Sequence, residues 1–99
     1  MEFKDLSTES LEKAAGMLKA MAHPVRMSIV ACLEDGNKKT VTEIHKQLGI
    51  EQSTASHHLG ILKDKSVLAS SREGKNTWYF LKHKSLKTVL SCISVCCQD

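Results

Sequence analysis

Residues 51–64 read EQSTASHHLGILKD, and this stretch decides the fold of the chain. Its apolar residues Ala55, Leu59 and Leu62 recur at i, i+4 and i+7, which predicts a helix with one narrow buried stripe. Side chains that are short or flexible and form hydrogen bonds can contact base edges in a DNA major groove. The other faces of the predicted helix carry such side chains: Gln52, Ser53, Ser56, His57 and Lys63. Taken alone, the pattern also suits an ordinary amphipathic surface helix, so the neighbouring segments decide between the two.

The segments around this helix favour DNA binding. Residues 42–48 predict a short helix just upstream, and residues 67–71 and 77–81 predict two strands rich in β-branched and aromatic residues. Gly74, between the strands, can adopt the positive φ that a hairpin tip requires. Helix, turn, polar helix and basic hairpin are the parts of a winged helix-turn-helix, so we predict a mainly α fold with a two-stranded β-wing. The predicted DNA contacts are Gln52, Ser53, Ser56, His57, Lys63, Arg72 and Lys75.

Two further helices are predicted before this unit. Ser7 can cap the first helix, whose apolar stripe continues to Met21. Pro24 suits the first turn of the second helix, which we expect to run to about Glu34 and to end at residues 35–36.

The remaining elements flank the proposed DNA-reading helix. We expect residues 40–41 to form a short strand and Thr42 to cap the short helix that follows. His58 adjoins the buried stripe, where it can contact DNA or hydrogen-bond to that short helix. The last helix covers roughly residues 85–97, with Cys97 near the centre of an apolar stripe formed by Leu86, Val89, Leu90 and Ile93.

Size and charge agree with a small DNA-binding domain. The 99 residues suit a single domain spanning the whole chain, residues 1–99. The net charge is +3, but residues 37–87 hold ten lysines and arginines against four acidic residues, whereas residues 1–36 are net negative. Positive charge thus gathers on the segment expected to face phosphates. No signal peptide or membrane-spanning run is present, so we expect a cytoplasmic protein whose four cysteines are thiols, metal ligands or redox groups.

The order of these motifs resembles the ArsR/SmtB family of bacterial repressors. The likeness lies in residues 52–59, in Leu62-Lys63, in residues 72–75 with Tyr79, and in residues 22–26, which read AHPVR. Ser66 departs from the family pattern, which has glycine before the first wing strand. The resemblance implies a homodimer formed through the first and last helices, and a repressor that occludes a promoter. It also implies release from DNA by a metal, metalloid or reactive sulfur species.

The C-terminal thiols are the predicted inducer site. Cys92 and Cys96 are four residues apart on one helix, so their sulfurs can converge on a thiophilic centre, and Cys97 could complete a trigonal set. Some arsenic-responsive family members resemble this arrangement, so trivalent arsenic or a similar soft metal is the predicted inducer. We predict no obligatory cofactor.

Two alternative sensor sites are also implied by the resemblance. Cys32 and a C-terminal cysteine, Cys97, are similar to a persulfide-sensing pair, although Cys32 by its position also suits core packing. His83 and Cys96 could bind zinc together with the carboxylate of Asp99. The Cys-x-Cys site that other members carry is absent, because the corresponding residues are Thr40-Val41-Thr42.

Two other classes of function, an enzyme and a protein-interaction module, fit the sequence less well. An enzyme with a Cys–His pair would need a pocket and an oxyanion or cofactor motif, and the sequence contains no such motif. An interaction module that had lost DNA binding would not need the polar helix face that residues 52–57 provide. We therefore predict a repressor whose partners are double-stranded operator DNA and a second copy of the chain, without membrane association.

Overall fold

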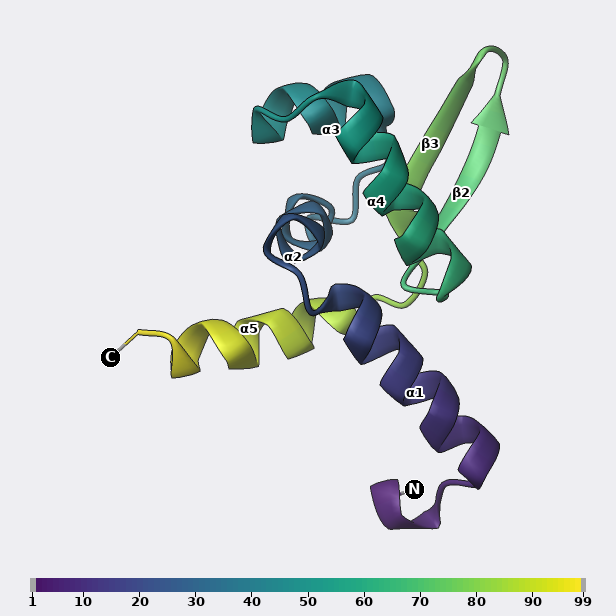
Figure 1. The fold of residues 1–99 in the computed structure, drawn as a ribbon, viewed down its shortest axis with the longest axis vertical. Helices are drawn as coiled ribbons and strands as arrows, with labels where there is room; N and C mark the ends of the chain where they lie inside the picture. The colour runs from purple at the N-terminus through teal and green to yellow at the C-terminus, as the bar shows by residue number, and fades with distance from the viewer. Residues whose placement is uncertain (1, 99) are drawn as a thin grey trace.

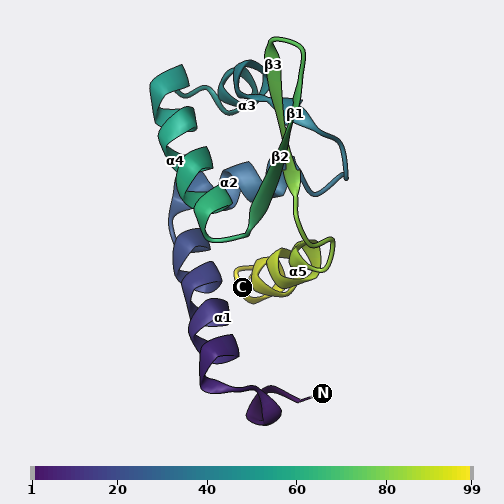
Figure 2. The same ribbon diagram turned by 90° about the vertical axis from the view of Figure 1, so that its right-hand side faces the viewer.

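The computed structural model describes residues 2–98, and five α-helices and three short strands account for most of them (Figures 1 and 2). A 3₁₀ turn, Phe3–Asp5, precedes them. In chain order they are α1 (Thr8–Met21), α2 (Pro24–Cys32), β1 (Lys39–Thr40), α3 (Val41–Leu48), α4 (Gln52–Asp64), β2 (Leu68–Glu73), β3 (Asn76–Leu81) and α5 (Leu86–Cys96). The predicted winged helix-turn-helix is confirmed, with α3 and α4 as its two helices and β2 and β3 as its wing.

The sheet has three strands, namely the two strands of the wing and a short strand close to the one expected at residues 40–41. All pairs are antiparallel, in the order β1-β3-β2. The additional strand β1 pairs Lys39 with Tyr79 and Thr40 with Trp78. Two residues are too few for an alternating pattern to be visible in the sequence, so the expected strand at residues 40–41 was displaced by one residue.

The cap of α3 is Thr40, and the prediction of Thr42 was wrong. The Thr40 hydroxyl accepts the Glu43 amide at 3.2 Å, and a Glu43 carboxylate oxygen accepts the Thr40 amide at 3.0 Å. This reciprocal pair is a capping box, which satisfies two amides that the first turn would otherwise leave unpaired. Thr40 therefore ends β1 and begins α3.

Helix α2 ends two residues before the predicted limit of Glu34. The amides of Leu33 and Glu34 bond to carbonyls three residues back, which tightens the last turn. Lys39 then donates from its ammonium to the free Cys32 carbonyl at 2.6 Å. Gly36, at φ +85°, reverses the chain toward β1.

The core lies where α2, α3, α4 and the start of β2 meet. The three apolar residues predicted to line α4, Ala55, Leu59 and Leu62, are all fully buried. They are joined by fully buried side chains from α2, α3 and the residues around β2, namely Ile29, Val30, Leu33, Ile44, Val67 and Leu68. Because this core holds one side of α4, the opposite side is left to solvent.

Ser66 stands in the left-handed region, at φ +64°, and is the one non-glycine residue with positive φ among residues 2–98. This is the turn between α4 and β2, where the family pattern has glycine. A side chain with a Cβ is strained there by about 1–2 kcal/mol.

We expect Ser66→Gly to raise the free energy of unfolding by about 1 kcal/mol, because relief of strain outweighs the greater flexibility of glycine in the unfolded chain. Thermal and urea denaturation would measure the change. Ser66→Ala, which keeps the Cβ, is the matched control and should give no such gain. A less stable Ser66→Gly variant would show that the serine side chain contributes more than the strain costs.

Candidate DNA-binding surface and thiol sites

The solvent-facing side of α4 is polar along its whole length. Gln52, Ser53, Ser56, His57 and Lys63 are all exposed. Gln52, Ser56 and Lys63 fall within a narrow arc at 100° per residue, with Ser53 and His57 beside them. Lys63 lies on the last turn, about 16 Å along the axis from Gln52 at 1.5 Å per residue. The face is long enough to contact base edges at its start and a phosphate at its end.

The turn between α3 and α4 is fixed by local contacts. Gly49 adopts φ +67°, a left-handed cap that ends α3. The Ile50 amide donates to the His45 carbonyl at 3.1 Å, and His45 Nδ1 lies 3.1 Å from the Ile50 carbonyl oxygen, to which it must donate. These contacts set the angle at which α4 leaves α3.

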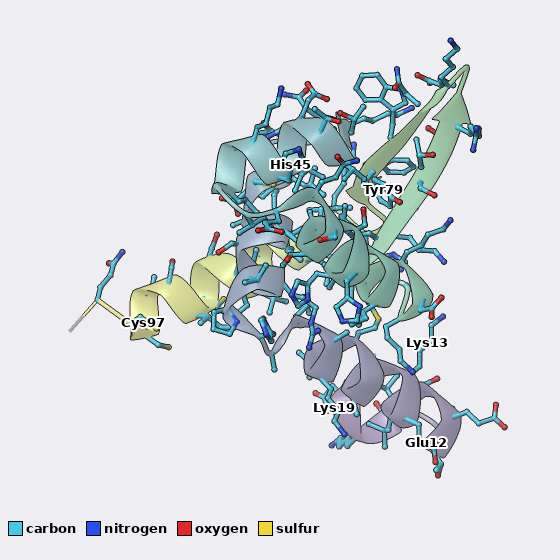
Figure 3. All side chains as sticks on the ribbon, turned by 45° about the horizontal axis from the view of Figure 1, so that its top comes forward. Glu12, Lys13, Lys19, His45, Tyr79 and Cys97 are labelled. Carbon is cyan, nitrogen blue, oxygen red and sulfur yellow. The ribbon has the colours of Figure 1, made fainter. Side chains whose placement is uncertain are left out.

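The wing carries exposed positive charge near its tip. Arg72 and Lys75 are exposed, and Gly74 at φ +62° makes the turn between the strands as predicted. Lys38 lies 3.8 Å from the Glu73 carboxylate and so offsets the one acidic side chain at the tip. Figures 1 and 2 show the wing tip and the first turn of α4 at the same end of the molecule. Tyr79, on β3, packs against the core on the side of the helices (Figure 3).

The polar partner of the His58 ring lies on α2 and not on α3, where a hydrogen bond was one of the expectations. The side chain is buried, and its ring centroid lies 4.7 Å from that of His23, at the start of α2. Its Nδ1 lies 3.4 Å from an Arg26 guanidinium nitrogen. Burial lowers the pKa of His58, and the neighbouring His23, Arg26 and His57 lower it further. Sequence reasoning did not include Arg26 in any site, because a contact between residues 26 and 58 has no local signal.

The three C-terminal thiols are on the surface of the single chain. Cys92, Cys96 and Cys97 are exposed and free, with no disulfide among them or Cys32. Cys97 was expected at the centre of the apolar stripe, but it lies at the outer end of α5 (Figure 3). There it lines an open groove of about 360 Å³ between α2 and α5, together with Met27, Ser28 and Ala31 of α2.

Cys32 is half-buried and packs against the core. Its thiol donates to the Ile29 carbonyl at 3.1 Å. Burial raises the pKa of the Cys32 thiol, the Lys39 ammonium opposes this, and the Asp35 carboxylate adds to it. A raised pKa lowers the thiolate fraction, so the isolated chain does not activate this cysteine.

The described part of a single chain contains no preformed metal site. Within residues 2–98, no three histidine, cysteine or carboxylate side chains are gathered so as to hold a metal ion. His83 is exposed, and Asp99, named in the zinc alternative, lies outside the described residues. Over the same range no helix is both long and apolar enough to cross a membrane.

Comparison with known proteins identifies the group to which this fold and surface belong. A helix-turn-helix domain family matches residues 21–70, about half of the chain. The chain is 35% identical over 85 residues to the transcriptional repressor PagR of Bacillus anthracis, covering 86% of this chain and 85% of PagR. It is 34% identical over 92 residues to the HTH-type transcriptional repressor SmtB of Mycobacterium tuberculosis, covering 92% of this chain and 67% of SmtB. The chain belongs to the ArsR/SmtB family.

Solved ArsR/SmtB structures agree with this fold. The crystal structure of PagR superposes with a TM-score of 0.79 at 34% identity, covering 88% of this chain and 99% of PagR. The homodimeric winged helix-turn-helix DNA-binding domain Mb0332 from Mycobacterium bovis, a possible ArsR-family regulator, gives a TM-score of 0.79 at 24% identity. The match covers 94% of this chain and 88% of Mb0332. Like its ArsR/SmtB relatives, the chain is a DNA-binding transcriptional regulator and not an enzyme.

Proposed function

We propose that the protein is a homodimeric repressor that binds operator DNA through α4 and the wing and releases it when a thiol-reactive inducer binds. The observation that carries the DNA-binding part is the exposed polar face of α4 beside a positively charged wing tip. The proposed base or phosphate contacts are the residues predicted from the sequence: Gln52, Ser53, Ser56, His57, Lys63, Arg72 and Lys75.

Exposed apolar side chains on α1 and α5 support the homodimer. Leu18 on α1 is 52% exposed and Val95 on α5 is 68% exposed, and Leu11 and Ile93 are also exposed. Burying these side chains against a second copy would stabilise both chains. A two-fold dimer places its two α4 helices in successive major grooves about 34 Å apart, so the operator should be an imperfect palindrome.

A mobility-shift assay on DNA flanking the protein's own gene tests this proposal. We expect a discrete complex that survives excess random DNA at moderate salt, and that weakens as salt concentration rises. A scrambled fragment of equal length and composition is the control. Equal affinity for both fragments at every salt concentration would contradict sequence-specific repression.

Lys75→Ala should weaken binding to operator and random DNA by similar factors, and should reduce the slope of log affinity against log salt by about 1. A phosphate contact releases counterions without reading sequence, so specificity should be preserved. Lys13→Ala, which removes an equal charge from an exposed site on α1 (Figure 3), is the matched control. A loss confined to operator DNA would mean that Lys75 contacts a base instead.

Trivalent arsenic or a similar soft metal is the proposed inducer, with Cys92, Cys96 and Cys97 as its ligands. Cys92 and Cys96 are exposed and one helical turn apart, and soft thiolate ligands favour thiophilic ions. Within residues 2–98 the three thiols form no preformed ligand set, so binding would have to draw them together at the end of α5. Such a movement at the end of α5 would disturb the surface proposed for dimer contact.

A persulfide-sensing repressor is the second candidate. The groove between α2 and α5 favours it, because Cys97 is the one C-terminal cysteine that lines this groove against α2, the helix that carries Cys32. A persulfide donor could transfer its outer sulfur to Cys97 and leave as a thiol. If α2 opened to expose the half-buried Cys32, the Cys32 thiol could then attack the Cys97 persulfide, releasing hydrogen sulfide and leaving a Cys32–Cys97 disulfide.

A further inference from the structure

A cluster of imidazole and guanidinium groups joins α4 to the corner between α1 and α2. His58 is buried on the inner side of α4, where its ring packs against His23, with centroids 4.7 Å apart, and against His57 at 5.3 Å. Arg26 donates from Nε to the Ala20 carbonyl in the last turn of α1, and its guanidinium also reaches His58. Arg26 thus contacts α1 and α4 from its place on α2.

The hydrogen bonds in this cluster require both imidazoles to be unprotonated at Nδ1. Arg26 has only donors, so the 3.4 Å contact with His58 Nδ1 needs an acceptor at that nitrogen. His23 Nδ1 likewise accepts the Val25 amide at 3.1 Å and thereby caps α2. A proton on either Nδ1 would replace a hydrogen bond with two opposed donors.

Among the described residues, no carboxylate acts on the charge of His58. The groups that act on it are Arg26 from α2, His23 from the corner and His57 from α4 itself. The adjoining surface between α1 and α4 adds Lys19 and Lys65, which line one groove with Arg26. Each of these groups is cationic or becomes so on protonation, so an imidazolium at position 58 would be buried among like charges.

We propose that His58, Arg26 and His23 form a proton-sensitive positioning cluster. Neutral His58 holds the DNA-contacting helix α4 in its position against α2, and protonation of His58 displaces α4 from that position. This inference rests on the proposed role of α4 in DNA binding. The cluster lies behind the DNA-facing side of α4, so it acts on recognition by setting the position of Gln52, Ser56 and His57.

The direction of the pH effect follows from the lowered pKa of His58. The folded protein, with α4 packed against α2, favours neutral imidazole relative to the unfolded chain, whose histidines titrate near pH 6.5. The stabilisation is therefore fully present above about pH 6.5 and is lost as the pH falls through the lower pKa of the folded state.

The test compares operator affinity at pH 7.5 and pH 5.5 in wild type and His58→Gln, because glutamine keeps a polar group and never gains charge. We expect the wild type to lose several-fold more affinity than His58→Gln on acidification. Arg26→Gln is the second variant: without the opposing cation, the acid loss should be smaller and its midpoint should lie at higher pH. Identical pH profiles in wild type and both variants would overturn the proposal.

An NMR titration of the free protein separates this inference from the proposed function. The His58 ring protons should titrate below the normal histidine range, and the amides of α4 should shift with the same midpoint in the wild type but not in His58→Gln. Titration of His58 without movement of the α4 amides would overturn the cluster's role. Absence of operator binding at pH 7.5 would instead overturn the proposed function, and the NMR result would stand independently.

Discussion

Gln52→Ala and His57→Ala should each weaken operator binding by about 1–3 kcal/mol, which is roughly 5- to 150-fold in affinity. Both side chains are exposed on α4, and neither takes part in the buried stripe that holds the helix. Truncation should therefore remove a base contact without disturbing the core. Competition assays with operator and random DNA would measure the loss, which should be greater for operator.

The fold and dimer must be unchanged for this result to be interpretable. Thermal denaturation and size-exclusion chromatography should give wild-type values for both variants. Thr88→Ala, at an exposed position on α5 away from its apolar stripe, is the control for loss of a polar side chain. Wild-type operator binding by both Gln52→Ala and His57→Ala would contradict the assignment of α4 as the helix that contacts bases.

Cys92→Ser and Cys96→Ser should each abolish inducer-driven release while leaving operator affinity unchanged. A hydroxyl has nearly the shape of a thiol but is a poor ligand for trivalent arsenic, so the variants should stay on DNA at arsenite concentrations that release the wild type completely. Fluorescence anisotropy of labelled operator, titrated with arsenite, would measure release. Cys32→Ser is the internal control, because the half-buried Cys32 should contribute packing and not ligation.

These three variants, together with Cys97→Ser, separate the two candidate inducers. Full release by both Cys92→Ser and Cys96→Ser would contradict the C-terminal thiol site. Loss of response confined to Cys32→Ser and Cys97→Ser, with a persulfide donor as inducer, would favour sulfur sensing instead. Mass spectrometry should then detect a sulfur bridge between these two residues.

The features predicted correctly from the sequence are those encoded by local periodicity and turn chemistry. The start and end of α4 and its three buried apolar residues follow from spacing along a single helix. The wing tip follows from Gly74. The departure from the family pattern at Ser66 left the geometry of the turn before β2 open, and the structure shows that the serine adopts positive φ there. The exposure of the polar residues of α4 follows from the same spacing, because they lie away from the buried stripe.

The features missed are those that depend on contacts between distant residues. A short strand was expected at residues 40–41, but its position at residues 39–40 is set by the pairing of Lys39 with Tyr79, which nothing near residue 39 signals. His58 was placed correctly beside the buried stripe, but its partner on α2 is 32 residues away. Cys97 occupies the expected side of α5 by helical spacing, yet it is exposed because α5 extends beyond the body of the single chain (Figure 3).

Thr40 belongs both to the sheet and to the cap of α3, and this has a mechanical consequence. Thr40 is the last residue of β1, which is paired to the wing through β3, and its side chain caps α3. Thr40 therefore couples the hairpin directly to the helix-turn-helix of the same chain. In the proposed mechanism, release from DNA would come from a change in the distance or tilt between the two protomers and not from a movement of the wing alone. A covalent tether across the proposed dimer that fixes this separation should then hold the protein on its operator even with inducer bound.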